Sequence, residues 1–154
     1  MQNTQLLEGQ LDHPQVLALL QQHLDEARST SPPESVHALD TTELQQSEVS
    51  FYTLWEKDEL LGFAALKQLD ATHGELKSMR TASEHQRRGV ASQLLTHVFS
   101  EARRYGLQRI SLETGSMSEY AAAREFYSRH GFSECEPFAD YKLDHHSRYM
   151  TRTL

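Results

Sequence analysis

Two stretches of the chain carry apolar residues at the spacing of a helix that is buried on one side. In the second of these stretches, the apolar residues that recur every four positions are Val90, Leu94, Val98 and Ala102. Nearer the amino terminus, Asp12 is expected to cap a helix that begins at Pro14 and runs to about residue 27. The buried face expected for this helix consists of Val16, Leu17, Leu20 and Leu24. Both patterns follow the period of an α-helix and predict two long amphipathic helices.

Short apolar stretches bounded by turn residues predict the strands. They are residues 5–8, 49–55, 60–69, 75–81, 107–114, 138–143 and 148–154. Shorter helices are expected at 41–44 and 121–130, and Gly62 is expected to mark a bulge or a close backbone contact. The strands at 75–81 and 107–114 flank one helix, which predicts a parallel pair with a right-handed crossover. We therefore expect an α/β (α+β) fold, in which helices flank a mixed, mostly antiparallel sheet.

Composition limits the class of protein. The chain has 154 residues, which suits one domain spanning residues 1–154. Its net charge of -7 disfavours a nucleic-acid-binding protein or one that adheres to anionic membranes. No stretch has the length of a membrane span, and the first residues lack the pattern of a signal peptide. One cysteine, Cys135, precludes an internal disulfide, so we expect a cytoplasmic protein.

The spacing of the histidines argues against a metal site. His145 and His146 are adjacent, and on a regular strand their side chains would point to opposite faces. Neither a second histidine four positions away nor a nearby cysteine accompanies them in the sequence. We therefore expect no metal cofactor.

The turn before the central helix has the features of an anion site. The first N–H groups of a helix lack internal partners and lie at the positive end of its dipole, so they attract anions. Gly89 leaves the backbone open to a ligand and tolerates the positive φ that anion-binding turns often use. Two arginines add positive charge beside it. The residues expected to bind a phosphate are therefore Gln86, Arg87, Arg88, Gly89, Val90 and Ala91.

Two motifs together resemble those of the GNAT superfamily of N-acetyltransferases. The turn at 86–91 matches the family's Arg/Gln-x-x-Gly-x-Gly/Ala loop, with Ala91 in place of the commoner glycine. Residues 123–132 match the family's A-x-x-x-Y-x-x-x-G-F helix and turn. The resemblance covers residues 74–132. It implies a GNAT fold with a splayed parallel strand pair, acetyl-CoA as cosubstrate, and direct transfer of acetyl to an amine without an acyl-enzyme.

The resemblance also implies roles for particular residues. The backbone of Met79 and Thr81 is expected to pair with the thioester carbonyl and the pantetheine arm of CoA, because a splayed strand leaves ladder groups free. Tyr127 matches the family tyrosine that gives a proton to the CoA thiolate. The loop at 29–35 and the residues that follow it correspond to the wall of the acceptor pocket in this family. Glu34 and His37 are therefore expected acceptor contacts.

Two carboxylates are candidates for the general base. An alkyl amine has a pKa near ~10, so it must lose a proton before it can attack. Glu75 opens the strand that leads to the phosphate-binding turn, where some family members similarly place a base glutamate. Glu113, on the neighbouring strand, is the rival base and an expected anchor for a cationic acceptor.

A second functional class remains open on the sequence. A non-catalytic protein that binds acyl-CoA and regulates a partner would need the same phosphate-binding turn. Glu75 and Tyr127 favour catalysis, because a sensor has no use for a base and an acid. The acceptor is expected to be an amine of a small molecule or a peptide. The sequence leaves the oligomeric state open, a homodimer included.

Overall fold

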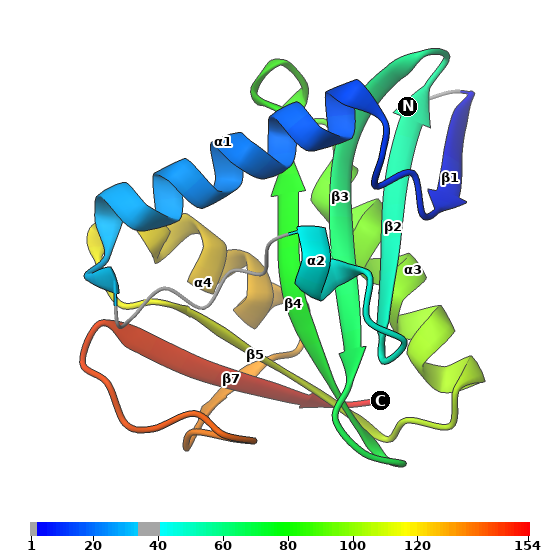
Figure 1. The fold of residues 1–154 in the computed structure, drawn as a ribbon. Helices are drawn as coiled ribbons and strands as arrows, with labels where there is room; N and C mark the ends of the chain where they lie inside the picture. The colour runs from blue at the N-terminus through cyan, green and yellow to red at the C-terminus, as the bar shows by residue number, and fades with distance from the viewer. Residues whose placement is uncertain (1–2, 34–40) are drawn as a thin grey trace.

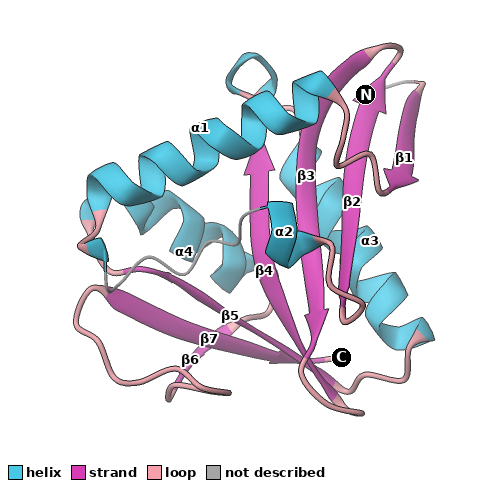
Figure 2. Ribbon diagram, in the orientation of Figure 1, coloured by secondary structure: helices cyan, strands magenta, loops and turns pink. Residues whose placement is uncertain are grey.

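The computed structural model describes residues 3–33 and 41–154. The strands are β1 (Thr4–Glu8), β2 (Val49–Glu56), β3 (Glu59–Gln68), β4 (His73–Thr81), β5 (Arg109–Gly115), β6 (Ser133–Cys135) and β7 (Ser147–Thr153). The α-helices are α1 (Pro14–Thr30), α2 (Thr41–Leu44), α3 (Val90–Arg104) and α4 (Ala121–Arg129). Short 3-10 turns, η2 (Ser83–His85) and η3 (Ser118–Tyr120), precede α3 and α4. Figure 2 shows these helices and strands, which alternate along the chain from β4 through α3 and β5 to α4.

The seven strands form one sheet in the order β1-β2-β3-β4-β5-β7-β6. Every neighbouring pair is antiparallel except β4 and β5, which are parallel. The crossover between these two strands runs through α3. The predicted mixed, mostly antiparallel sheet with one parallel pair is therefore confirmed.

Helices cover both faces of the sheet. In Figure 1, α1 and α2 lie in front of the strands, and α3 and α4 lie behind them. Each face has its own buried cluster, since Leu94 and Val98 of α3 pack with Leu54 and Leu66, whereas Val16 of α1 belongs to the other cluster. A space that contacts both α1 and α4 must therefore pass through the sheet.

The first long helix differs in detail from the prediction. Its N-cap is His13 and not Asp12, because the imidazole Nδ1 accepts a hydrogen bond from the backbone N–H of Gln15. The helix also continues to Thr30, beyond the predicted end. The predicted buried face was wrong at Leu17, which is 42% exposed because it lies at the edge of the apolar stripe. Leu19 takes its place in the core.

The predicted carboxyl-terminal hairpin was wrong in its first strand. Residues 138–143 are not a strand, and the partner of β7 is the three-residue β6. The stretch instead belongs to the loop 136–146, where Tyr141 turns toward the sheet and contacts Glu75 and Lys77 of β4. Side-chain hydrogen bonds of Tyr141, and not backbone pairing in a strand, therefore hold this segment against β4.

Gly62 fulfils both of its predicted roles. The register between β2 and β3 shifts beside it, since Leu54 pairs with Gly62 and Trp55 pairs with Leu60. A Cβ at Gly62 would stand 2.5 Å from the carbonyl oxygen of Arg80. The close approach of β3 to β4 at this point therefore requires glycine.

Candidate active site

The parallel strands β4 and β5 separate beside the residues that are expected to form the active site. β4 pairs with β5 only from His73 to Glu75, although β4 itself stays paired with β3 as far as Thr81. β5 meanwhile follows β7 to Gly115. The backbone of β4 beyond Glu75 therefore lacks a ladder partner on the β5 side, which is the predicted splay.

A cavity of about 160 Å³ fills this splay. Its walls include His23 and Ala27 from α1, and Ala123 and Tyr127 from α4. Because α1 and α4 cover opposite faces of the sheet, the cavity passes between the strands from one face toward the other. Two ligands that approach from opposite faces can therefore meet inside it.

A β-bulge in β4, which no sequence pattern indicates, shapes the wall of this cavity. Leu66 pairs with Leu76 and Ala65 pairs with Ser78, which leaves Lys77 as the extra residue. Such a bulge changes the direction in which the following side chains point. Lys77 and Ser78 both line the cavity as a result. No glycine marks this bulge, so local sequence could not reveal it.

The turn at residues 86–91, which is expected to bind a phosphate, has the backbone of an anion site. Gly89 caps α3 in the left-handed conformation, with φ of 80°, and Arg87 also has a positive φ of 64°. Left-handed residues next to a helix start gather backbone N–H groups into a concave anion-binding nest. A Cβ at Gly89 would meet no atom within 4 Å, so the glycine serves the conformation and leaves the approach open.

The two arginines of the turn have different surroundings. Arg88 forms a forked ion pair with both carboxylate oxygens of Glu56, at 3.1 and 3.0 Å, and contacts His85 Nδ1 at 2.6 Å. It thereby ties the turn to the end of β2. Arg87 is exposed beside the nest. Of the two, Arg87 is the side chain more open to a phosphate.

Tyr127 lies on α4 with its ring at the edge of the core and lines the cavity. The ring meets Phe126 and Phe132 edge-on, with centroids 5.5 and 5.7 Å apart. Burial, together with the nearby charge of Glu113, raises the pKa of Tyr127 to about 12. The phenol is therefore protonated at neutral pH and has a proton to donate in the cavity.

Glu113, on β5, is the carboxylate that lines the same cavity. Burial raises its pKa to about 7, although a hydrogen bond from Ser147 Oγ at 2.8 Å and the charge of Lys77 act in the opposite direction. A carboxyl group with this pKa exchanges a proton readily near neutral pH. This property depends on tertiary burial, which explains why sequence reasoning could not rank Glu113 above Glu75.

Glu75 has a different environment. It is 2% exposed, and its Oε2 accepts a hydrogen bond from Tyr141 at 2.6 Å and contacts Lys77 Nζ at 3.4 Å. Lys77 in turn donates to the Tyr141 hydroxyl at 2.6 Å. The three side chains form a closed network that anchors the loop 136–146 to β4.

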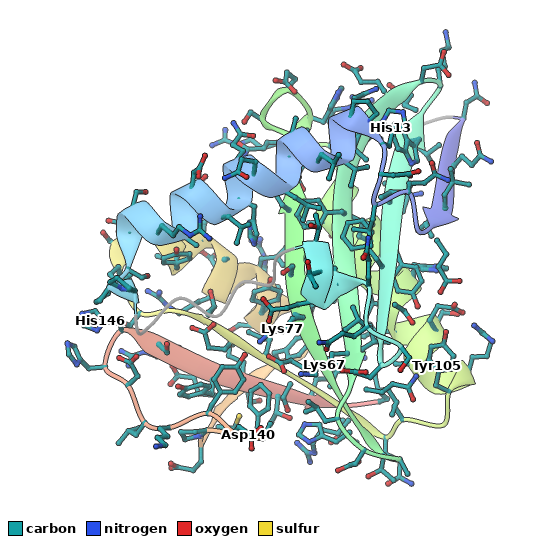
Figure 3. All side chains as sticks on the ribbon, viewed as in Figure 1. His13, Lys67, Lys77, Tyr105, Asp140 and His146 are labelled. Atoms are coloured by element: carbon teal, nitrogen blue, oxygen red, sulfur yellow. The ribbon has the colours of Figure 1, made fainter. Side chains whose placement is uncertain are left out.

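A second cavity, of about 620 Å³, lies next to this network. Glu75, Lys67 and residues 139–146 line it, and Lys77 lines both cavities. Figure 3 shows Lys77 in the middle of the sheet, between α2 and the strands β5 and β7, with Lys67 further along the strands. The small cavity in the splay therefore adjoins a larger one at Lys77.

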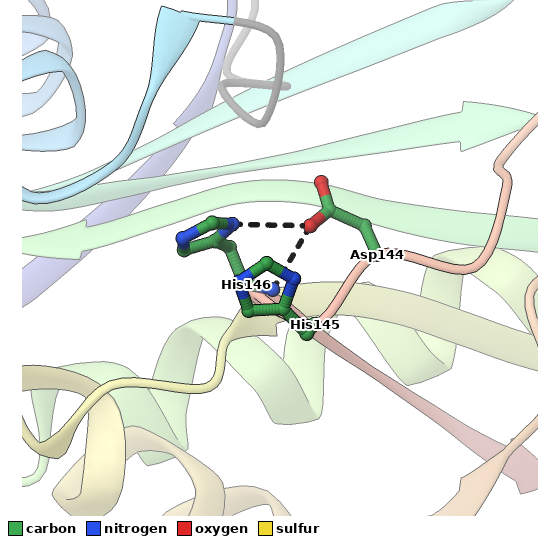
Figure 4. Close-up of side chains that lie close together, drawn as sticks. All are labelled: Asp144, His145 and His146. Atoms are coloured by element: carbon green, nitrogen blue, oxygen red, sulfur yellow. Dashed lines mark hydrogen bonds and ion pairs between the residues drawn. The ribbon is translucent and has the colours of Figure 1, made fainter.

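The histidine pair has a geometry that the sequence did not predict. His145 and His146 lie in a turn, and their rings are 3.9 Å apart. With Asp144 they bring three possible metal ligand atoms within 4.8 Å of one another (Figure 4). The premise that the two rings point apart was therefore wrong. Hydrogen bonds from the backbone N–H and the ring of His146 to Asp144 account for the arrangement.

Two predicted acceptor contacts, Glu34 and His37, lie outside the described residues. Within residues 3–33 and 41–154, no helix combines the length and the apolar character needed to cross a membrane.

The chain is thus an α/β protein in which a concave backbone turn precedes α3 and lies beside a splayed parallel strand pair. The model of the acetyltransferase (GNAT) family matches residues 16–132. The chain belongs to this family and is an acyltransferase, an enzyme of acetyl transfer.

Two relatives resemble the chain over nearly its whole length. It is 51% identical over 144 residues to the uncharacterized N-acetyltransferase YedL of Escherichia coli strain K12, covering 94% of this chain and 91% of the relative. It is also 51% identical over 140 residues to the uncharacterized N-acetyltransferase YsnE of Bacillus subtilis strain 168, covering 91% and 93%.

Solved structures share the fold at low sequence identity. A GNAT-family acetyltransferase from Staphylococcus aureus Mu50 superposes with a TM-score of 0.76 at 19% identity, covering 97% of this chain and 98% of that one. A GNAT-family acetyltransferase from Elizabethkingia anophelis, solved with acetyl-CoA bound, gives a TM-score of 0.67 at 17% identity over the full length of both chains.

Proposed function

We propose that this enzyme transfers acetyl from acetyl-CoA to an amine of a small molecule or peptide, by direct attack in a ternary complex. The observation that carries the proposal is the cavity through the splay of β4 and β5, which has walls from helices on both faces of the sheet. A thioester entering from the α3 and α4 side and an amine entering from the α1 side meet there without a covalent intermediate. The reaction then needs only proximity, a base and an acid.

The acetyl-CoA half of the proposal rests on the turn before α3. The nest formed at Arg87 and Gly89 holds the pyrophosphate, with the start of the α3 dipole behind it. From there the pantetheine arm follows the unpaired edge of β4, where Met79 and Thr81 remain the expected backbone partners. The acetyl-CoA-bound relative of the same fold supports this cosubstrate.

Glu113 is the base that the geometry favours. It lines the cavity with Tyr127, and its pKa of about 7 leaves a large fraction ionised at neutral pH, yet basic enough to take a proton. Glu75, the base predicted from the sequence, stays a prediction. Its carboxylate already accepts from Tyr141 and faces Lys77, which favours a role in shaping the acceptor side of the site.

Tyr127 supplies the proton for the departing thiolate. Its hydroxyl makes no hydrogen bond with any other described residue, which leaves the phenol available to a ligand in the cavity. The burial that raises the pKa of Tyr127 weakens it as an acid, but the same burial raises the pKa of a thiol released beside it and so makes the thiolate a stronger proton acceptor. This match supports the assignment carried by the family motif.

Release of CoA thiol from acetyl-CoA across a panel of primary amines tests the proposal. The panel covers amino acids, polyamines, aromatic amines and peptides with free amino termini, and thiol release is measured with and without each amine. Amine-dependent release with an acetylated product supports catalysis. Tight acetyl-CoA binding with no release for any amine would instead favour the alternative of a non-catalytic acyl-CoA sensor.

A further inference from the structure

Tyr120 forms one wall of the cavity between β4 and β5. Its ring lies against Gly115, at the end of β5, so closely that a Cβ on Gly115 would overlap the ring. Its hydroxyl lies 2.6 Å from Thr30 Oγ1, at the end of α1. Tyr120 therefore bridges β5 and α1 beside the cavity that it lines.

Hydrogen bonds to α4 and to the turn before β7 hold the segment that precedes Tyr120 in place. Arg124 of α4 donates to the carbonyl oxygens of Gly115 and Met117, at 2.7 and 3.0 Å. The backbone N–H of Ser116 donates to the carbonyl oxygen of His146, at 3.0 Å. These bonds fix the chain immediately before Tyr120, so the ring is a built part of the wall.

The space beside this wall is small and contains an unpaired polar group. A volume of about 160 Å³ is well below the several hundred Å³ that hold a drug-sized ligand, and the acetyl group takes part of it. Ser78 lines the same space, is 5% exposed, and has a buried hydroxyl that finds no hydrogen-bond partner among residues 3–33 and 41–154. A buried unpaired hydroxyl points to a ligand that pairs with it. The space thus fits the polar, reacting end of an acceptor and not its whole body.

We propose that Tyr120 is a specificity-determining residue that restricts the acceptor to primary amines borne on an unbranched carbon. This inference rests on the proposed amine acetylation. The amine and its first carbon occupy the small cavity, and the acceptor body lies in the cavity of about 620 Å³ that adjoins it at Lys77. A substituent on the first carbon meets the Tyr120 ring.

The test uses matched pairs of amines with acetyl-CoA, each pair differing by one methyl group on the amine-bearing carbon, namely benzylamine with its α-methyl analogue and n-propylamine with sec-butylamine. In the parent, kcat/KM for the unbranched amine should exceed that for the branched one by about 10- to 200-fold, the usual discrimination of a pocket against one extra carbon. In Tyr120→Ala this ratio should fall by about tenfold or more. Tyr120→Phe keeps the ring and should keep the ratio.

Two further variants make the result specific. Gly115→Ala displaces the ring without removing it and should lower the ratio as Tyr120→Ala does. Tyr105→Ala removes a tyrosine at the end of α3, outside both cavities, and should leave the ratio unchanged. Transfer by the parent with no preference, or an unchanged preference in Tyr120→Ala and Gly115→Ala, overturns this inference alone. A parent that acetylates no amine overturns the proposed function and the inference with it.

Discussion

Replacing Glu113 by glutamine should have opposite effects on activity and on stability. As the base, Glu113 must be ionised, so kcat/KM of the parent should fall about tenfold per pH unit below its pKa of about 7 and level off above it. Glu113→Gln should lose roughly 10² to 10⁴-fold in kcat/KM at pH 8 and lose this dependence on pH. Initial rates of thiol release between pH 5 and 9, at limiting amine, measure both.

The stability effect follows from the same pKa. The ordinary value of 4.5 applies to the unfolded chain, and burial raises it to about 7 in the folded protein. Ionisation of Glu113 therefore lowers the free energy of unfolding. This loss is absent below pH 4.5, grows between pH 4.5 and 7, and reaches at most roughly 3 kcal/mol above pH 7. Glu113→Gln, which cannot ionise, should be more stable than the parent at pH 8 by up to that amount, and equally stable at pH 4.

Urea unfolding of the parent and of Glu113→Gln at pH 4 and pH 8 measures this difference. Ser147→Ala is the matched control, because it removes the hydrogen bond that favours the ionised carboxylate and should move the rate profile to higher pH. A glutamine variant that keeps the parent's pH profile would refute Glu113 as the base. Equal stabilities at pH 8 would show that the carboxylate is not buried as described.

Three other substitutions test the remaining parts of the site. Gly89→Glu should weaken CoA affinity sharply in calorimetry, because it puts bulk and negative charge in the phosphate nest and strains a residue with φ of 80°. Unchanged affinity in a folded variant would show that CoA does not bind at this nest. Glu75→Gln should lose roughly 10² to 10⁴-fold in kcat/KM if Glu75 is the base. A smaller loss, expressed mainly in the KM for the amine, is expected if it only holds Tyr141 and Lys77. Tyr127→Phe should lower kcat by about 10² to 10⁴-fold with little change in acetyl-CoA Kd, since its interaction grows only as charge develops on sulfur; equal kcat under conditions where chemistry limits turnover would leave Tyr127 as a packing residue.

Local sequence patterns predicted the features of this structure that depend only on residues close together in the chain. The four-residue spacing from Val90 to Ala102 required a helix, and Gly89 before it gave the turn its left-handed backbone. The strands at either end of that helix had to run parallel, which placed the splay. These features need only neighbouring residues and the handedness of one crossover.

Other features depend on contacts that join distant parts of the chain. Tyr141 lies in a stretch with the composition of a strand, yet that stretch is a loop, and the Tyr141 hydroxyl joins it to Glu75 of β4 by a hydrogen bond. The bulge at Lys77 and the wall at Tyr120 likewise depend on β3 and α1, which no local pattern specifies. The pKa of Glu113 depends on how deeply the finished fold buries it. The sequence therefore indicates both carboxylates and favours Glu75, because the burial that distinguishes Glu113 is a property of the folded chain.

Direct transfer requires that acetyl-CoA and an amine are bound together in one cavity. Initial rates with both substrates varied, using the best amine of the panel, test this requirement. Direct transfer gives double-reciprocal lines that intersect, and a protein whose mass is unchanged after incubation with acetyl-CoA alone. Parallel lines, with one acetyl group retained on the protein, would establish an acyl-enzyme and contradict it.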